Sequence, residues 1–332
     1  MAGKQVRAVV VGASSPLGKE LADQLNDTGS TLWDLSLVDA GEGGRMTAAA
    51  DEAMVISGLT PASFSGAEIV FFAGEPSLTR AHWKEAQAAG ASVVDLTGAL
   101  EREAGAVVLA PGVGPARPDL ATTVVVAAHP AAVMLATVLK AVHAGAGQAV
   151  SAATVLVPAS QWGEVAIEEL QRQTVSLLSF QAVAREFFDA QTAFSVLGGF
   201  GAAAKADIRL EEQTVRRHLH MLSPDAKCAV QLLQAPVFHG YGASVWVASG
   251  ANATEESLAN ALKAAGLEVA NDQATEVSNA GAAGQGTILA RLREDTDGVW
   301  LWLAADNLHV AARNGLACAD ALLRLRPSGT LQ

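Results

Sequence analysis

Cysteine is scarce in this chain of 332 residues, which contains only Cys228 and Cys318. The two lie far apart in the sequence and neither belongs to a metal-ligand spacing, so no metal site is expected. A chain without a disulfide framework suits a reducing compartment, and we expect the cytoplasm. The residues Met1–Arg7 lead directly into a predicted strand and lack the apolar segment of a signal peptide.

Long apolar runs and a surplus of positive charge are missing as well. No segment reaches the roughly 18 uninterrupted apolar residues that a membrane span requires, so we expect no membrane partner. Asp and Glu number 34 against 22 Lys and Arg, and the resulting net charge of -12 repels phosphate backbones. A nucleic-acid partner is therefore not expected.

Aromatic residues are few, at 5%, and Tyr241 is the sole tyrosine, whereas half of all residues are hydrophobic. The abundant Ala and Val predict parallel strands buried on both faces under Ala-rich helices. The chain length predicts two domains.

The N-terminal half begins with a strand, a glycine turn and a helix. Val6–Val11 is a short apolar run, Gly12–Gly18 reads GASSPLG, and Lys19–Leu25 follows as a predicted helix. This order is typical of the opening of a Rossmann unit, in which the helix N-terminus offers N–H groups to a pyrophosphate. Ser15 replaces the usual middle glycine and crowds the phosphate approach. The candidate cofactor-binding residues of this turn are Gly12, Ser14, Ser15, Leu17 and Gly18.

A second predicted strand, Leu35–Asp39, ends in an acid about twenty residues after the turn. Asp39 can accept a hydrogen bond from a ribose 2′-OH, which favours NAD over NADP. A third strand, Ile69–Ala73, ends at Gly74, which we add to the cofactor-binding candidates. The alternation of strands and helices continues in Thr79–Ala89, Ser92–Leu96, Ala106–Ala110 and Thr122–Ala127. We predict a Rossmann-like, doubly wound domain; the alternative is a doubly wound domain whose glycine turn binds nothing.

The pattern of strands and helices in the C-terminal half predicts an α+β domain with a mixed sheet. Its helix Glu164–Leu178 is expected to place Glu168 and Glu169 on a solvated side, and Ala182–Lys205 has the composition of a loop. One face of the sheet is expected to be free to bury against another subunit. The remaining predicted helices are Ala131–Ala144, Leu210–Met221, Thr254–Ala265 and Leu308–Leu325, and the strands are Ala149–Val157, Cys228–Gln234, Ser244–Ser249, Thr287–Leu292 and Val299–Ala304.

The order of these motifs resembles the aspartate-semialdehyde dehydrogenase family over nearly the whole length. The segments that carry the resemblance are Gly12–Gly18, Leu59–Gly66, Phe72–Gly74, Val94–Asp95, Ala166–Leu170, Pro236–Gly240 and Asp306–Asn307. The resemblance implies an NAD(P)-binding domain of residues 1–128 plus 308–332, with the C-terminal helix returning to it. It also implies a dimerisation and substrate domain of residues 129–307, a homodimer, and a small-molecule ligand.

Enzymes of that family form a thioester through a cysteine thiolate, with a histidine as acid and base and cationic side chains for substrate carboxylate and phosphate. The resemblance implies that this chain lacks these groups, so no catalytic residue is expected. The nucleophile position is Ala132, the glutamine position falls near Val157, and the histidine position is Tyr241. The two arginine positions are Gln234 and Glu101.

The segment Gln234–Phe238 (QAPVF) is similar to that of the Usg-type paralogues of the family, which also lack the cysteine. Trp162 is much larger than the small residue expected at its place, and we hypothesise that it fills the substrate space. Cys228 and Cys318 fall in elements expected to be buried and are interpreted as structural.

Three functions remain open at this point. The first is a non-catalytic, nucleotide-binding or regulatory homodimer. The second is an active NAD(P)-dependent oxidoreductase that reduces a small carbonyl compound without a thioester, with Tyr241 or His129 as the proton donor. The third is a structural protein whose glycine turn binds no cofactor. The sequence does not identify the ligand, the pathway or an active paralogue as partner.

Overall fold

The computed structural model describes residues 5–27, 33–41, 44–49, 52–147, 149–248, 254–270 and 288–325. These residues form two compact units. The first contains the described residues up to His129 together with those from Ala311 onward, and the second spans Pro130–Val310. No helix among the described residues is long and apolar enough to cross a membrane.

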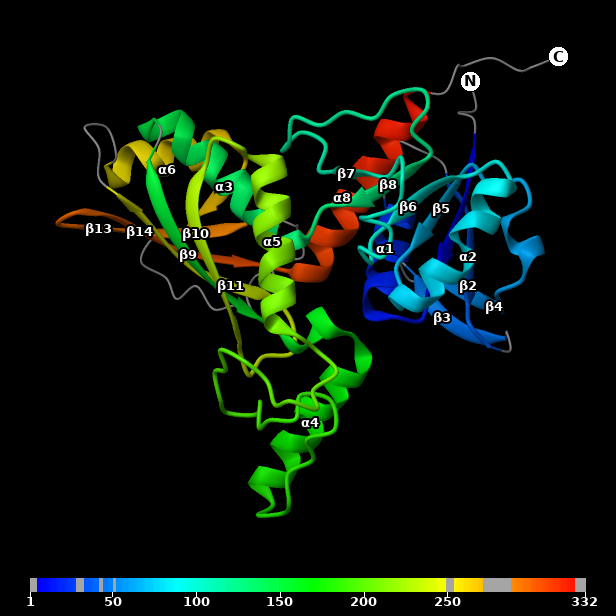
Figure 1. Ribbon diagram of the computed structural model, residues 1–332, viewed down its shortest axis with the longest axis horizontal. Helices are drawn as coiled ribbons and strands as arrows, with labels where there is room; N and C mark the ends of the chain where they lie inside the picture. The colour runs from blue at the N-terminus through cyan, green and yellow to red at the C-terminus, as the bar shows by residue number, and fades with distance from the viewer. Residues whose placement is uncertain are drawn as a thin grey trace. The chain divides into compact units, whose positions relative to one another are not determined.

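Eight strands of the first unit form one sheet within the described part of the chain (Figure 1). Their spatial order is β3-β4-β2-β1-β5-β6-β8-β7, and every neighbouring pair is parallel except β3 and β4. The strands are β1 (Val6–Val11), β2 (Trp33–Asp39), β3 (Arg45–Ala49), β4 (Glu52–Gly58), β5 (Ile69–Phe72), β6 (Ser92–Asp95), β7 (Val107–Leu109) and β8 (Val124–Ala127).

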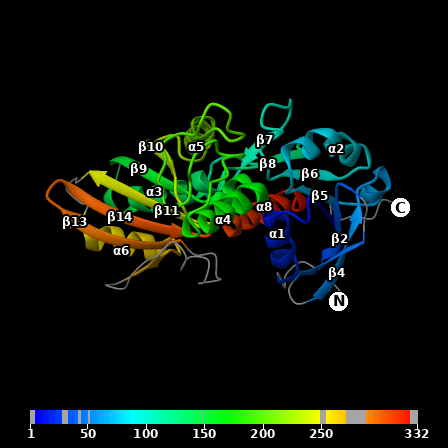
Figure 2. The same ribbon diagram turned by 90° about the horizontal axis from the view of Figure 1, so that it is seen from below.

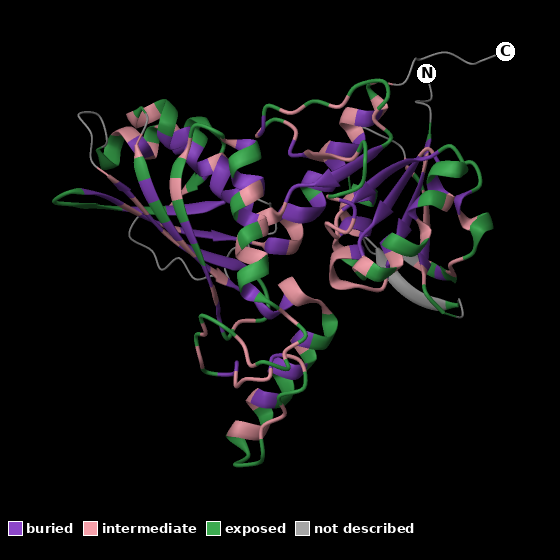
Figure 3. Cartoon of the chain, in the orientation of Figure 1, coloured by how far each residue is buried: buried purple, intermediate pink, exposed green. Residues whose placement is uncertain are grey.

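Helices cover both faces of this sheet, because the central strands carry apolar side chains on both sides. Helix α1 (Pro16–Asp27) and the later part of α8 (Asn307–Leu323) pack on the face that includes Val10 and Phe71. Helix α2 (Pro76–Ala88) and the 3-10 helix η1 (Pro61–Phe64) pack on the opposite face. Figure 3 shows the central strands of this sheet as buried. The predicted doubly wound arrangement and the returning C-terminal helix are confirmed.

The second unit contains a six-stranded mixed sheet in the order β10-β9-β11-β14-β13-β12. The outer pairs β10–β9 and β12–β13 are parallel, and the inner pairs are antiparallel. The strands are β9 (Val150–Val157), β10 (Lys227–Gln234), β11 (Tyr241–Ala248), β12 (Glu268–Val269), β13 (Leu289–Asp295) and β14 (Gly298–Ala305).

Three helices cover one face of this sheet. Helix α3 (Pro130–Ala146) contacts both α5 (Ile208–Leu222) and α6 (Glu255–Ala264). Helix α5 also contacts β10, and α6 contacts β12 and β13, so the two lie near opposite edges of the sheet (Figure 2). Burial alternates along the strands as a one-sided core requires.

Helix α4 (Glu164–Leu178) follows the 3-10 helix η2 (Ala159–Trp162) and projects, with the loop after it, from the end of the sheet (Figure 1). The expectation that Glu169 is solvated is wrong, because its side chain is fully buried. Its carboxylate accepts hydrogen bonds from the backbone N–H groups of Phe187 and Phe188. The helical pattern of α4 is consistent with solvent on that side, but the long loop returns over it and buries the carboxylate.

The sequence patterns did not predict β3, β4 and β12. Two of these are peripheral, because β3 is at one end of its sheet and β12 is at the end of the other. Strand β4 pairs with β2 through only three residue pairs, Leu37–Ile56 to Asp39–Gly58. The predicted strand Thr287–Leu292 corresponds to β13, and its first residue, Thr287, is outside the described residues.

Candidate functional site

The glycine turn after β1 packs backbone against backbone. Gly12 has a φ of +82°, and a Cβ there would lie 2.3 Å from the Cα of Gly74. A Cβ on Gly18 would lie 2.2 Å from the carbonyl oxygen of Gly12. Both positions therefore require glycine, because any side chain would push the turn away from β5 or α1 away from the turn. The turn, the start of α1 and the end of β5 are held in the close arrangement that dinucleotide-binding turns show.

Ser15 uses its hydroxyl inside this turn. The Oγ donates to the carbonyl of Ala73 at 2.7 Å and accepts from the N–H of Gly18 at 2.8 Å. The hydroxyl therefore caps α1 and anchors the turn to the end of β5. The Ser15 hydroxyl is thus engaged with two backbone groups, and its crowding of a phosphate stays a prediction.

Asp39, the last residue of β2, also contacts the turn. Its Oδ2 accepts from the backbone N–H of Ser14 at 3.0 Å and from the Ser14 hydroxyl, and its Oδ1 accepts from the N–H of Ala40 at 2.7 Å. The side chain is half-buried. A carboxylate has about four acceptor positions, so about one remains after these three bonds. One free acceptor suits one ribose hydroxyl.

In the second unit, Tyr241 lies at the N-terminus of α3. Its side chain is fully buried, and its hydroxyl donates to Oε1 of Gln161 and accepts from the backbone N–H of Ala131. Burial raises the pKa of the Tyr241 phenol well above its ordinary value, and the carboxylate of Glu211 raises it further. The phenol is therefore neutral at physiological pH. The adjacent helical residue Ala132 is also fully buried.

Gln161, which the sequence analysis did not single out, connects Tyr241 to an acid. Its Nε2 donates to Glu211 on α5 at 2.7 Å while its Oε1 accepts from the phenol. The chain of hydrogen bonds thus runs from Glu211 through Gln161 and Tyr241 to the N-terminus of α3. No local signal marked Gln161, because the contact joins residues 80 positions apart.

Gln234 and Trp162 form a second buried contact near the ends of β9 and β10. The indole N–H of Trp162 donates to Oε1 of Gln234 at 2.7 Å, and the ring packs edge-on against Phe200. The Nε2 of Gln234 donates to the carbonyls of Val157 and Ala235. The polar edge of Trp162 is therefore directed inward and not to solvent. That it fills a substrate space stays a prediction.

Asn307, the first residue of α8, joins two loops of this region. Its Oδ1 accepts from the Ser160 hydroxyl at 3.1 Å and from the backbone N–H of Gly240 at 3.0 Å. These bonds place η2 and the turn before β11 beside each other. The exposed His239 of that turn lies outside this hydrogen-bonded set.

Neither cysteine has the environment of a nucleophile. Burial raises the pKa of both thiols above the ordinary value. Cys318 is fully buried and lies near the carbonyl of Leu109 in the first unit. Cys228 is on β10, six residues and about 20 Å along the strand from Gln234. Cys228 was expected in a buried strand, but it is half-buried and the first residues of β10 are partly exposed.

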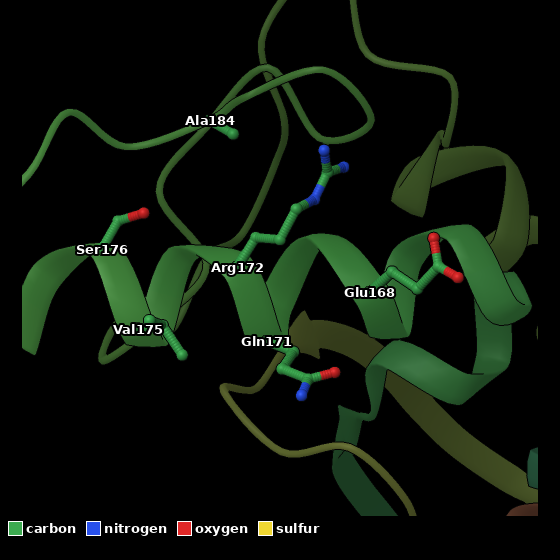
Figure 4. A pocket seen from close by; sticks show the side chains of 6 residues that line it. All are labelled: Glu168, Gln171, Arg172, Val175, Ser176 and Ala184. Carbon is green, nitrogen blue, oxygen red and sulfur yellow. The ribbon is translucent and has the colours of Figure 1, made fainter.

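An open groove of about 520 Å³ runs along α4. Arg172 lines the groove and also forms an exposed ion pair with Glu186, which lies outside the lining. None of the lining residues is a histidine or a cysteine (Figure 4). The lining residues are Glu168, Gln171, Arg172, Val175, Ser176 and Ala184. Within the described residues, no group of three or more His, Cys, Asp or Glu side chains could hold a metal ion.

Comparison with known families identifies both units. A family model for the NAD binding domain of semialdehyde dehydrogenases matches residues 7–121, and one for their dimerisation domain matches residues 132–310. The chain belongs to the semialdehyde dehydrogenase family.

Curated relatives that match nearly the whole chain include the following two. A USG-1 protein homolog of Azotobacter vinelandii is 28% identical, over 95% of this chain and 97% of its own length. The aspartate-semialdehyde dehydrogenase of Bacillus subtilis is 26% identical, over 97% of this chain and 99% of its own length. The crystal structure of aspartate semialdehyde dehydrogenase II from Vibrio cholerae aligns with a TM-score of 0.84 at 22% identity, covering 97% of this chain and 99% of that chain. The family resemblance and the fold expected from it are confirmed.

Four of the five positions at which the resemblance implied a missing reactive group lie in the second unit. Gln234 contacts Val157 directly, and Tyr241 bonds to Ala131, the neighbour of Ala132. Glu101 lies in the first unit, in the turn after β6, and is half-buried.

Proposed function

We propose that this chain is a nucleotide-binding homodimer of the semialdehyde dehydrogenase family that does not carry out the phosphorylating oxidation of a semialdehyde. The observation that supports this proposal best is the N-terminus of α3. There Ala132 offers a methyl group, and the Tyr241 hydroxyl occupies the backbone N–H of Ala131.

The thioester route needs a thiolate and a group that exchanges a proton with it. A methyl group cannot bond covalently to the substrate carbon. Tyr241 cannot replace the histidine, since its phenol is neutral and already makes two hydrogen bonds. In a serine protease, the loss of the nucleophile alone lowers the rate about a millionfold. A loss of that order here leaves no useful rate.

The burial of Tyr241 also argues against the thioester-independent oxidoreductase that we considered. A proton donor must reach the substrate oxygen, directly or through one water. Tyr241 is fully buried and its hydrogen already goes to Gln161. That route would then depend on the half-buried His129.

The first unit supports nucleotide binding, with NAD preferred over NADP. A nicotinamide cofactor supplies a hydride acceptor or donor to enzymes of this fold. Here the turn from Gly12 to Gly18 is suited to hold the pyrophosphate, and Gly74 allows the close approach of that turn to β5. Asp39 would accept the ribose 2′-OH, and its negative charge would repel the 2′-phosphate of NADP.

The face of the six-stranded sheet opposite α3, α5 and α6 supports the homodimer. Trp246, Trp300 and Trp302 are half-buried on the face opposite the helices, and Trp246 is paired with Trp300 across β11 and β14. Arg293 is opposite Trp300 on the next strand. An aromatic surface with arginine beside it has the composition of a protein interface. A second copy of the chain is the occupant that we propose for this face.

Catalysis is tested directly with the purified protein. Incubation with aspartate semialdehyde, phosphate and either NAD or NADP should give no cofactor reduction above the rate without protein. The aspartate-semialdehyde dehydrogenase of Bacillus subtilis, the relative described above, serves as the positive control. Sustained turnover by this chain would refute the proposal, and oxidation of NADH with a panel of small carbonyl compounds would favour the oxidoreductase alternative.

Dimerisation is tested by sedimentation velocity. The wild type should sediment as a dimer, and Trp300→Glu should shift it to a monomer because a charge would be buried in the interface. Leu120→Glu is the matched control, since Leu120 is exposed in the first unit. A monomeric wild type would contradict the dimer, and a dimeric Trp300→Glu variant would contradict the choice of face.

A further inference from the structure

Ser14 holds the carboxylate of Asp39 in place from two directions. Its backbone N–H and its side-chain hydroxyl both donate to Oδ2, across 25 positions of sequence. The glycine turn is itself bound to β2, because the N–H groups of Gly12 and Ala13 donate to the carbonyl of Val38. The first turn of the unit and the end of its second strand therefore form one hydrogen-bonded structure.

Oδ1 of Asp39 is the carboxylate oxygen that can accept a further hydrogen bond. Oδ2 has two donors from Ser14, whereas Oδ1 has one, the N–H of Ala40. A carboxylate that rotates would present either oxygen to a ligand. A carboxylate fixed by two donors on one oxygen presents the other in a single orientation, which lowers the entropy lost when a ligand hydroxyl binds.

We propose that Ser14 is a specificity-determining, positioning residue for the nucleotide, acting through Asp39. This inference rests on the proposed nucleotide-binding function of the first unit. With Ser14 present, Asp39 is held at the end of β2, where it accepts one hydroxyl of an unphosphorylated ribose. It also keeps its charge where a 2′-phosphate would have to lie.

Removal of the Ser14 hydroxyl should change the choice between the two nucleotides. In Ser14→Ala the backbone N–H groups of residues 14 and 40 still donate to Asp39, but the carboxylate loses its side-chain donor and is held less firmly. NAD binding should weaken and NADP binding should strengthen, so the preference for NAD should fall about tenfold, the effect of one hydrogen bond to a charged group. A merely structural role for Ser14 would weaken both nucleotides alike.

The experiment is isothermal titration of NAD and NADP into the purified full chain. The wild type should bind NAD about a hundredfold more tightly than NADP, because NADP adds a dianionic group beside a carboxylate. Asp39→Asn should bring the two affinities to within a few-fold. Ser14→Thr, which keeps the hydroxyl, should restore the preference that Ser14→Ala loses. The control Asp34→Asn neutralises an exposed carboxylate on the same strand and should leave the ratio unchanged.

The outcomes separate the two proposals. An unchanged NAD-to-NADP ratio in Ser14→Ala, with both nucleotides still bound, would overturn the role of Ser14 and leave nucleotide binding intact. Failure of the wild type to bind either nucleotide would overturn this inference together with the nucleotide-binding part of the proposed function. Melting temperatures of the variants show that each is folded before its ratio is compared.

Discussion

Replacement of Tyr241 by Phe removes one oxygen atom from the interior of the second unit and leaves no cavity larger than that atom. The hydroxyl is the donor to Oε1 of Gln161 and the acceptor for the N–H of Ala131. Both groups would lose the hydroxyl of Tyr241, which is fully buried, as a partner. An unsatisfied buried polar group costs about 1–3 kcal/mol, and Gln161 is half-buried and can recover part of this from water. We expect the free energy of unfolding to fall by about 2–4 kcal/mol.

The assay is urea unfolding followed by tryptophan fluorescence, with calorimetry to locate the transition of the second unit. Thr137→Val is the matched control on the same helix, because the Thr137 hydroxyl donates to the carbonyl of Val133 within α3. Its removal leaves no buried group without a partner, so a change of no more than about 0.5 kcal/mol is expected. Equal effects of the two substitutions would refute the assignment of Tyr241 as the buried cap of α3.

Three further predictions concern the same unit and its chemistry. Alkaline titration of the native protein at 295 nm should show no tyrosinate near pH 10, where the unfolded chain titrates. Because the folded pKa of Tyr241 is the higher one, the contribution of Tyr241 to stability should be constant below pH 10 and fall above it. Ionisation of Tyr241 in the native protein near pH 10 would contradict its burial. Ala132→Cys should not restore dehydrogenase activity, because Tyr241 remains a neutral donor; measurable cofactor reduction would show that the missing sulfur is the sole defect. Glu169→Gln should make Phe187 and Phe188 exchange their amide hydrogens faster, as measured by hydrogen exchange, and unchanged exchange would contradict its role in holding the loop.

Much of the fold could be predicted from the chain because its signals are local. The buried runs, the glycine turn and the periodicity of α3 and α4 predicted the doubly wound sheet and the mixed sheet. The requirement for glycine at positions 12 and 18 is likewise a backbone property that a short motif carries. The strands that were not predicted are the peripheral β3 and β12, and β4, which pairs with β2 through three residue pairs.

From the sequence, the candidate site could be predicted only as a set of missing reactive side chains. The order of motifs predicted that Ala132 and Tyr241 take the places of reactive residues, and this stays a prediction. It did not indicate that the Tyr241 hydroxyl caps α3, or that Gln161 links it to Glu211. Each of these contacts joins segments that are distant in the chain, so no window of sequence contains both partners.

Asp39 and Glu169 illustrate the same difference between what the local sequence determines and what tertiary packing determines. The position of Asp39 at the end of a strand follows from its local apolar pattern, but its bond to Ser14 depends on how β1 and β2 pair. Glu169 has the helical phase of a solvated residue, and only the return of a loop across α4 buries it. Periodicity defines which way a side chain leaves its own element, whereas the packing of other elements decides whether water or protein meets it there.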